Sequence, residues 1–270
     1  MTTTVPSHGT GPQPAITIHG VSKIYPGVDG TGLEALRNFS LDIHEGEFIS
    51  LLGPSGCGKT TLMMIVAGLL PLTSGEVVLG GRSVDRPVTD AGIVFQSPVL
   101  LDWRDVIGNV MLQIEARNLP KAEYRQRSRE LLERVGLEGF ENHYPWQLSG
   151  GMQQRVSLCR ALVHDPPYLF MDEPFGALDA LTREQNVRDL HKLWYERRKT
   201  VIFVTHSIPE AVFLSSRVAV MTPRPGQIEE IFHIDLPFPR RLDLHATPAF
   251  LHYISAAQRL FQRHGVLRDD

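Results

Sequence analysis

The residues with the clearest chemistry form an octapeptide with the spacing G-x-x-x-x-G-K-[ST], namely Gly53, Pro54, Ser55, Gly56, Cys57, Gly58, Lys59 and Thr60. Glycines at these positions let successive backbone N–H groups turn inward around a phosphate. Lys59 would bring an ammonium to the outer phosphates, and Thr60, which Thr61 follows, would offer a hydroxyl to Mg²⁺. The alternative is a glycine-rich turn with a chance lysine. Apolar runs before and after the octapeptide favour the first interpretation, because they predict a strand, a loop and a helix whose free N–H groups attract an anion.

Two acids end an apolar run at Tyr168–Glu173 and could serve the same ligand. Open α/β sheets bind ligands at the carboxyl ends of their strands, where Asp172 would lie beside the phosphate loop and hold Mg²⁺. Glu173 points in another direction and could act as a general base toward a water molecule. Taken alone, a strand that ends in solvated acids is common. The phosphate loop upstream makes the catalytic interpretation the stronger one.

A second candidate anion site is Ser149-Gly150-Gly151, at the start of a helix predicted from about residue 151 to 163. A hydroxyl, free N–H groups and little side-chain bulk suit a phosphate. An ordinary helix cap is the alternative, and it explains the paired glycines poorly. Two phosphate-binding helix ends nearly a hundred residues apart can serve one nucleotide if two copies of the chain meet head to tail.

Composition limits the classes of function. The chain has 270 residues, a net charge of −3 with scattered basic residues, and two cysteines, Cys57 and Cys159. This distribution argues against a nucleic-acid surface, and the distant cysteines favour free thiols in a reducing compartment. The first fourteen residues lack the apolar segment of a signal peptide, and no apolar run reaches the length of a membrane-spanning helix. Any work at a membrane would go through partners.

The elements that must position these residues follow an α/β pattern. Strands are expected at 15–24, 33–43, 48–52, 77–79, 93–95, 168–172, 201–204 and 218–221, and helices at 61–68, 106–118, 123–135, 151–163 and 181–198, with a further helix after Ser207. The repeated strand–helix order predicts a parallel sheet covered on both faces. The early strands predict an antiparallel β subdomain beside it. The fold class is therefore a P-loop NTPase core with an antiparallel β subdomain and an inserted α-helical subdomain.

The expected domain organisation has three parts: a disordered tail (1–14), a nucleoside-triphosphate-binding domain (15–236) with the helical subdomain inserted at about 98–160, and a C-terminal helical extension (237–270). In the extension, Thr247 and Pro248 begin a helix with one apolar face. Packing of that face against its own domain is the main expectation, and contact with a partner is the alternative.

Taken in order, Gly53–Thr60, Gln96, Leu148–Arg155, Tyr168–Glu173, Ala177–Asp179 and His206 resemble the nucleotide-binding subunit of ATP-binding-cassette transporters, over residues 15 to 230. The resemblance implies a homodimer that encloses two ATP molecules. Each would lie between the phosphate loop of one subunit and Ser149, Gly150 and Gly151 of the other. One departure is Met152, where many members have Gln.

The resemblance also assigns single residues. Gln96 would reach Mg²⁺ and the attacking water and link the helical subdomain to the site. His206 would contact the γ-phosphate and hold the water with Glu173. Asp179 would lie at the dimer seam, and Tyr25 would stack on adenine. Without the resemblance, His206 would be an ordinary strand-end histidine and Tyr25 a strand terminus.

Residues 96–103 (QSPVLLDW) and 223–228 (PRPGQI) resemble the importer subunits of the nitrate, sulfonate and taurine group. This implies a transmembrane permease, an indirect role for a solute-binding protein, and a place on the cytoplasmic face of the inner membrane. Trp103 would lie near the groove for a permease helix. The solute, described only as a small anion, is not written in this chain.

Two other functions are alternatives to an importer ATPase. A cassette protein acting on DNA or ribosomes would be expected to carry a long coiled-coil insertion or two cassettes, and neither pattern is found. A nucleotide-binding module without turnover is disfavoured by the intact set Lys59, Asp172, Glu173 and His206.

Overall fold

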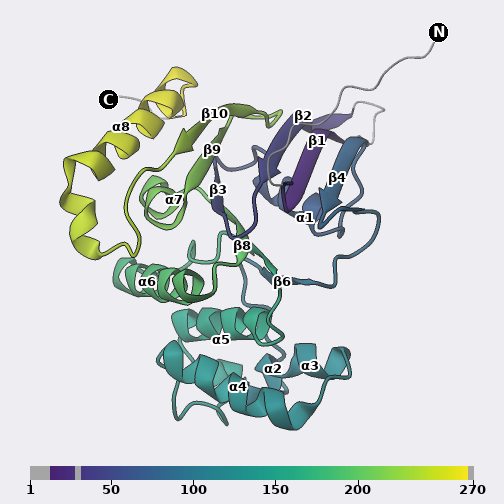
Figure 1. Cartoon of the computed structure of the whole chain (residues 1–270), viewed down its shortest axis with the longest axis vertical. Helices are drawn as coiled ribbons and strands as arrows, with labels where there is room; N and C mark the ends of the chain where they lie inside the picture. The colour runs from purple at the N-terminus through teal and green to yellow at the C-terminus, as the bar shows by residue number, and fades with distance from the viewer. Residues whose placement is uncertain (1–12, 28–31, 267–270) are drawn as a thin grey trace.

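The computed structural model describes residues 13–27 and 32–266, and within these ranges the strands form two sheets (Figure 1). The larger sheet has the strand order β10-β9-β3-β8-β7-β6, and the smaller has the order β2-β1-β4-β5. The predicted N-terminal tail lies outside the described residues except for its last two positions. The strands of the larger sheet are β3 (Phe48–Leu52), β6 (Ala91–Val94), β7 (Tyr168–Asp172), β8 (Thr200–Thr205), β9 (Arg217–Met221) and β10 (Ile228–His233).

The larger sheet is parallel except for β10, which pairs antiparallel with β9. Strands β3 and β8 are buried along their whole length, as expected of strands covered on both faces. Leu52 lies opposite Thr205, and Asp172 lies opposite Val204, so β3, β8 and β7 end at the same edge of the sheet. This edge is where the sequence places its candidate catalytic residues.

The smaller sheet is antiparallel, as predicted, and its strands are β1 (Ile16–Tyr25), β2 (Leu33–Ile43), β4 (Ser74–Leu79) and β5 (Arg82–Ser83). In β2, the side chains of Phe39, Leu41 and Ile43 are buried, and the residues between them are exposed. One face of this sheet therefore contributes to a core, and the other faces solvent. Neither β5 nor β10 was expected, because both are short, partly exposed edge strands without an apolar run.

The helices are α1 (Lys59–Val66), α2 (Val106–Val110), α3 (Leu112–Ala116), α4 (Lys121–Arg134), α5 (Gly150–Leu162), α6 (Ala180–Arg197), α7 (Ile208–Leu214) and α8 (Pro248–Arg263), with 3₁₀ turns at Pro145–Gln147 and Leu242–Ala246. The single helix expected at 106–118 is wrong, since the structure breaks it into α2 and α3 at Met111. There the N–H of Ile114 bonds to the carbonyl of Met111, a 3₁₀-type bond that tightens the chain.

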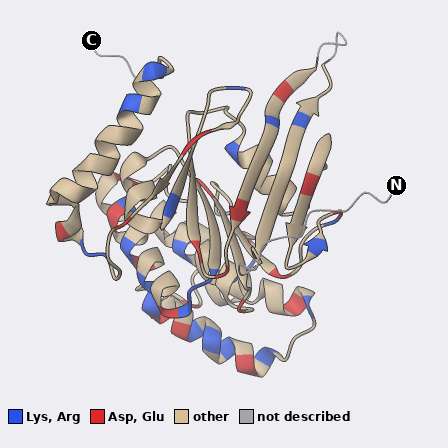
Figure 2. Cartoon of the chain, turned by 45° about the horizontal axis from the view of Figure 1, so that its top comes forward, with Lys and Arg blue, Asp and Glu red and all other residues tan. Residues whose placement is uncertain are grey.

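Two apolar clusters cover the two faces of the larger sheet. One lies between the sheets and contains the buried face of α1, with Leu62 and Met63, together with residues of β1 and β2. The other joins the opposite face to the helices α2–α8. Charged residues of both signs gather on the outer helices, while the central strands carry few (Figure 2). Among the described residues, no helix combines the length and hydrophobicity needed to cross a bilayer.

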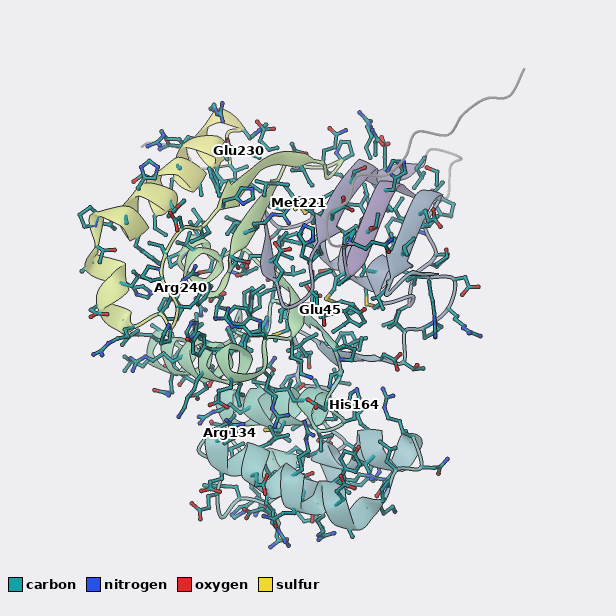
Figure 3. All side chains as sticks on the ribbon, viewed as in Figure 1. Glu45, Arg134, His164, Met221, Glu230 and Arg240 are labelled. Atoms are coloured by element: carbon teal, nitrogen blue, oxygen red, sulfur yellow. The ribbon has the colours of Figure 1, made fainter. Side chains whose placement is uncertain are left out.

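Helix α8 packs back onto its own chain, as expected, through Phe250, Ala257 and Phe261. The segment that leads to α8 is fixed by Arg240, which lies beside α7 (Figure 3). The Arg240 side chain is 5% exposed, and burial lowers its pKa to about 10. Its guanidinium donates to the carbonyl oxygens of Val212, Phe213, Ser215, Ile234 and Leu236.

We therefore expect Arg240→Ala to lower the free energy of unfolding by about 3 kcal/mol, because several buried carbonyls lose their donor. The measurement is urea-induced unfolding. The neighbouring side chain of Arg241 is 84% exposed, so Arg241→Ala is the matched control and should change the stability by less than about 0.5 kcal/mol. Equal effects of the two substitutions would contradict the anchoring role of Arg240.

Candidate functional site

The phosphate loop occupies the carboxyl end of β3 and leads directly into α1. Gly58, which precedes α1, has φ +102°, a conformation that residues with a side chain rarely adopt. A Cβ at this position would also lie 2.8 Å from the carbonyl oxygen of Ala35 on β2. Both constraints explain why the loop needs glycine at this position.

Lys59 is almost fully buried, with 4% of the residue exposed. Its ammonium donates to the carbonyl oxygens of Gly53 (2.8 Å) and Pro54 (3.0 Å), and it lies 3.6 Å from the Glu173 carboxylate. The charge is therefore held over the loop by neutral acceptors and one acid. An ammonium so placed can exchange these carbonyls for phosphate oxygens.

Thr60 and Asp172 meet although they are far apart in sequence. The Thr60 hydroxyl donates to the Asp172 carboxylate at 2.9 Å. Burial raises the pKa of the Asp172 carboxyl, the hydrogen bond from Thr60 lowers it by a smaller amount, and the net shift is upward. A hydroxyl and a buried carboxylate side by side are the hard oxygen ligands that suit Mg²⁺, which commonly uses one or two protein oxygens together with phosphates.

The backbone turns at Glu173, the residue that directly follows β7. Its φ of +42° lies in the left-handed region, which is strained for a residue with a side chain. This turn directs one carboxylate oxygen toward Lys59 and the other to Nδ1 of His206, at 3.0 Å. A carboxylate between a cation and an imidazole is well arranged to bind and polarise a water molecule.

These residues line one cleft of about 380 Å³. Its predicted members are Tyr25, Ser55, Gly56, Gly58, Lys59, Thr60, Thr61, Gln96 and Glu173, and its other members are Leu33, Ala35 and Arg224. Asp172 and His206 adjoin the cleft through their hydrogen bonds to Thr60 and Glu173. Gly53, Pro54 and Cys57 form the body of the loop, and burial raises the pKa of the Cys57 thiol, which argues against a reactive thiolate.

Gln96 follows the strand β6 and is joined to the helical subdomain through its neighbours. The side chain of Gln154 on α5 donates to the carbonyl of Phe95 at 3.1 Å, and Arg160 donates to the carbonyls of Pro98 and Val99. The backbone before and after Gln96 is thus bonded to side chains of α5. The N-terminus of α5 carries Ser149, Gly150 and Gly151.

Ser149, Gly150, Gly151 and Asp179 do not line the cleft of their own chain. Ser149 caps α5 by accepting from the N–H of Met152, and Asp179 caps α6 by accepting from the N–H of Thr182. A Cβ on Gly151 would lie 2.3 Å from the Thr182 side chain, so packing inside the chain explains this glycine. A Cβ on Gly150 would meet nothing within 4 Å, so no intrachain contact requires Gly150 to be a glycine.

Arg224 is a residue of the site that the sequence patterns do not predict. Arg224 lines the cleft, and its Nε donates to the carbonyl of Gly56 at 3.2 Å. The loop that carries it, between β9 and β10, is attached to β2 by a hydrogen bond from Gly226 N–H to the Ala35 carbonyl. Residues 223–228 resemble a segment of importer subunits, but nothing local in them indicates contact with the phosphate loop.

A glycine loop and two acids at the carboxyl edge of a parallel sheet define a P-loop nucleoside triphosphatase. Comparison with known proteins narrows the class. Residues 36–176 match the ABC transporter family. An uncharacterised ABC transporter ATP-binding protein of Methanocaldococcus jannaschii is 49% identical over 225 residues, which are 83% of this chain and 84% of that protein.

The taurine import ATP-binding protein of Rhizobium johnstonii is also 49% identical, over 212 residues, 78% of this chain and 80% of that protein. A solved structure, described as the dimeric post-hydrolysis state of an ATP-binding cassette bound to ADP and Pi, superimposes with a TM-score of 0.73 at 35% identity. It covers 82% of this chain and all of that one. The chain belongs to the ABC transporter family and is an ATPase of that family, which confirms the predicted family, fold class and enzyme class.

The raised pKa of Asp172 gives a pH-dependent prediction for the protein without nucleotide. A carboxyl whose pKa is raised by folding favours the folded state at low pH, and this benefit is lost as the pH rises through the folded-state pKa. Asp172→Asn should therefore raise the melting temperature at pH 7, with a difference that shrinks toward pH 4, although it should abolish ATP turnover.

Asp179→Asn is a control for which the opposite change in melting temperature is expected. The hydrogen bond from Thr182 lowers the pKa of Asp179, so its carboxylate stabilises the fold above the ordinary pKa and loses this effect as the pH falls. This variant should melt at a lower temperature at pH 7. A lower melting temperature for Asp172→Asn at pH 7 would show that burial does not dominate at that carboxylate.

Proposed function

We propose that the chain is the ATP-hydrolysing subunit of an importer for small organic sulfonates such as taurine. The observation that carries the ATPase assignment is the cluster in which Glu173 lies between Lys59 and His206, next to the pair of Thr60 and Asp172. The sulfonate assignment rests on the relative named as a taurine import protein.

The proposed roles follow the positions of the side chains. Lys59 binds the outer phosphates, and the loop N–H groups from Gly53 to Thr60, with Thr61 beyond them, surround the triphosphate. Tyr25, whose hydroxyl lies 3.3 Å from the Thr61 hydroxyl, stacks on adenine. Glu173 accepts the proton of the attacking water, and His206 contacts the γ-phosphate and orients that water.

Thr60, Asp172 and Gln96 are the proposed protein partners of Mg²⁺, Asp172 through a water molecule. When bound, the ion neutralises charge on the β- and γ-phosphates. Thr60 and Asp172 already lie in contact through their oxygens, and Gln96 reaches the same cleft. Their own contribution is to position oxygen donors beside the phosphate loop before the nucleotide arrives.

The second half of each site would come from another copy of the chain. Ser149, Gly150 and Gly151 lie away from the cleft of their own chain, and Asp179 caps a neighbouring helix. A second copy would bring the Ser149-Gly150-Gly151 helix end onto the γ-phosphate, with Asp179 at the seam. The open space at Gly150 supports this arrangement, because no contact inside the chain explains that glycine.

Transport requires partners that this chain must reach from outside the bilayer. We assign the chain to the cytoplasmic face of the inner membrane, attached to transmembrane permease subunits, with a solute-binding protein acting on the far side. Trp103 is 75% exposed at the start of the helical subdomain, as a contact for a permease helix would need to be. ATP-driven closure of the dimer would then drive the permease between its two states.

Glu173→Gln tests the proposed base. The substitution keeps the shape of the side chain but removes its basicity, so turnover should fall by about 10²–10⁴-fold while ATP binding persists. The variant should also accumulate as an ATP-bound dimer in size-exclusion chromatography. Lys59→Ala is the comparison, because loss of a charge-assisted phosphate contact should weaken ATP binding itself by about tenfold or more. Near-normal turnover by Glu173→Gln would exclude Glu173 as the base.

The solute is tested by transport. The chain, purified together with its permease and reconstituted in vesicles with the binding protein, should accumulate labelled taurine only when ATP is present, and Glu173→Gln should abolish this uptake. Uptake of nitrate without taurine would refute the solute but leave the importer. Failure to recover any permease with the chain would refute the importer itself.

A further inference from the structure

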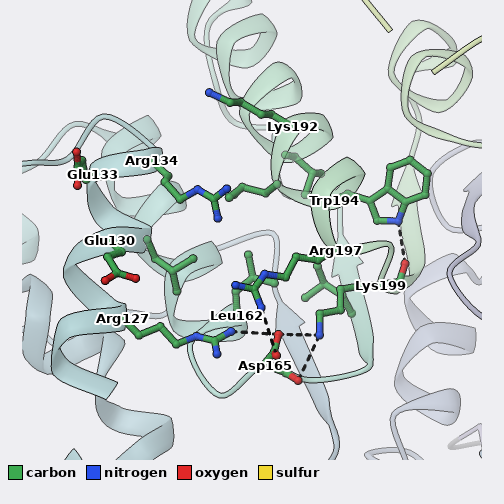
Figure 4. A pocket seen from close by; sticks show the side chains of 14 residues that line it. Arg127, Glu130, Glu133, Arg134, Leu162, Asp165, Lys192, Trp194, Arg197 and Lys199 are labelled. Atoms are coloured by element: carbon green, nitrogen blue, oxygen red, sulfur yellow. Dashed lines mark hydrogen bonds and ion pairs between the residues drawn. The ribbon is translucent and has the colours of Figure 1, made fainter. Parts of the chain in front are cut away.

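A second cleft lies between the helical subdomain and the core, away from the nucleotide cleft. It has a volume of about 510 Å³, larger than that of the nucleotide cleft, and the two share no lining residue. One wall is α4, and the other is formed by α6 with the segment that enters β8 (Figure 4). Its size is within the range of small-molecule sites, roughly 300–1,000 Å³.

The cleft combines an apolar lining with charged groups. The apolar residues are Leu131, Leu162, Leu169, Leu190, Leu193 and Trp194. The cations are Arg127, Arg134, Lys192, Arg197 and Lys199, and the acids are Glu130, Glu133 and Asp165. The lining thus carries five positive and three negative groups, a net excess of two positive charges.

The excess charge is concentrated around one carboxylate. Asp165 pairs with Lys199 at 2.7 Å, Arg127 at 3.0 Å and Arg197 at 3.5 Å. Burial alone would raise the pKa of Asp165, but the hydrogen bond and charge of Lys199, helped by Arg127, lower it below its ordinary value. The single Asp165 carboxylate therefore pairs with three cations, which point toward it from both walls (Figure 4).

The remaining acids do not balance these cations. Glu130 accepts a hydrogen bond from Gln126 on its own helix, and both Glu130 and Glu133 are exposed residues of α4. Arg134 is paired with Glu196, which does not line the cleft. A ligand that supplies negative oxygens near Asp165 would pair with cations that now share a single carboxylate.

We propose that this cleft binds a small organic anion with an apolar body, whose sulfonate, carboxylate or phosphate oxygens meet Arg127, Arg197 and Lys199. The apolar body lies on the leucines and Trp194 between the walls. Because Arg127 belongs to the helical subdomain and Arg197 and Lys199 belong to the core, the bound anion contacts both. The site is separate from ATP binding and does not depend on the identity of the imported solute.

The test is calorimetric titration of the full chain with 1-octanesulfonate, in saturating ADP so that the nucleotide cleft is filled. Inorganic sulfate is the comparison ligand that carries charge but no apolar tail. The second comparison ligand, 1-octanol, carries the tail but no charge. We expect octanesulfonate to bind at one site per chain, with an affinity that falls as salt rises, and to bind at least tenfold more tightly than either comparison ligand.

Variants locate the binding. Arg127→Gln on one wall and Lys199→Gln on the other should each weaken octanesulfonate binding by about tenfold or more. Arg125→Gln on α4 and Arg188→Gln on α6 remove exposed cations outside the cleft and should leave the affinity unchanged. Leu162→Trp should block binding, because the larger side chain would fill part of the cleft. Thermal melting without ligand reports whether each variant is folded.

Absence of octanesulfonate binding, or equal loss in the cleft variants and the control variants, would overturn the proposal. So would full affinity in a folded Leu162→Trp protein. ATP turnover measured on the same samples keeps this result apart from the proposed function, because an inactive ATPase with a working anion cleft, or the reverse, is recognisable.

Discussion

The site depends on the parallel pairing of three strands. Strand β8 lies between β3 and β7, and the three end at one edge of the sheet, with Leu52 opposite Thr205 and Asp172 opposite Val204. The phosphate loop begins directly after β3. Glu173 directly follows β7, and His206 directly follows β8. A slip of one residue between β7 and β8 would therefore displace Glu173 from both Lys59 and His206, because alternate side chains point to opposite faces.

Bringing these groups together concentrates charge in a poorly hydrated place. Lys59 and Asp172 are both buried, and burial raises the pKa of Asp172 in spite of the Thr60 hydroxyl. Glu173 adds backbone strain through its positive φ. Such costs are typical of sites organised for a ligand, and here the phosphates of ATP would compensate the charge of Lys59. The rest of the core has to provide the stability that the site does not.

Helix α5 connects the cleft to the helical subdomain. It holds the backbone on both sides of Gln96 through Gln154 and Arg160, and its first turn carries Gly150 and Gly151. A movement of α5 would therefore move Gln96 and Ser149 together. The cationic cleft around Asp165 lies across the other junction of the same subdomain, where α4 faces α6. Both junctions join the helical subdomain to the core.

Much of the architecture follows from local sequence. The octapeptide 53–60, the apolar runs of the parallel strands and the helix start at Thr247-Pro248 each express a preference that nearby residues alone create, and the structure has each of them. Ser207 shows the limit of such reasoning. Ser207 and Glu210 have the spacing of a capping box, which predicts that each side chain bonds to the backbone N–H of the other residue. Ser207 does cap α7 by accepting from the N–H of Glu210, but the Glu210 side chain accepts from the Thr205 hydroxyl instead.

Contacts between residues distant in sequence were decided only by the tertiary structure. These include the approach of Arg224 to Gly56, the position of α5 beside Gln96 and the three cations around Asp165. The local sequence determines which backbone conformations are cheap and which side chains are charged. It does not determine which distant charges become neighbours, because that depends on how the sheets and helices pack as a whole.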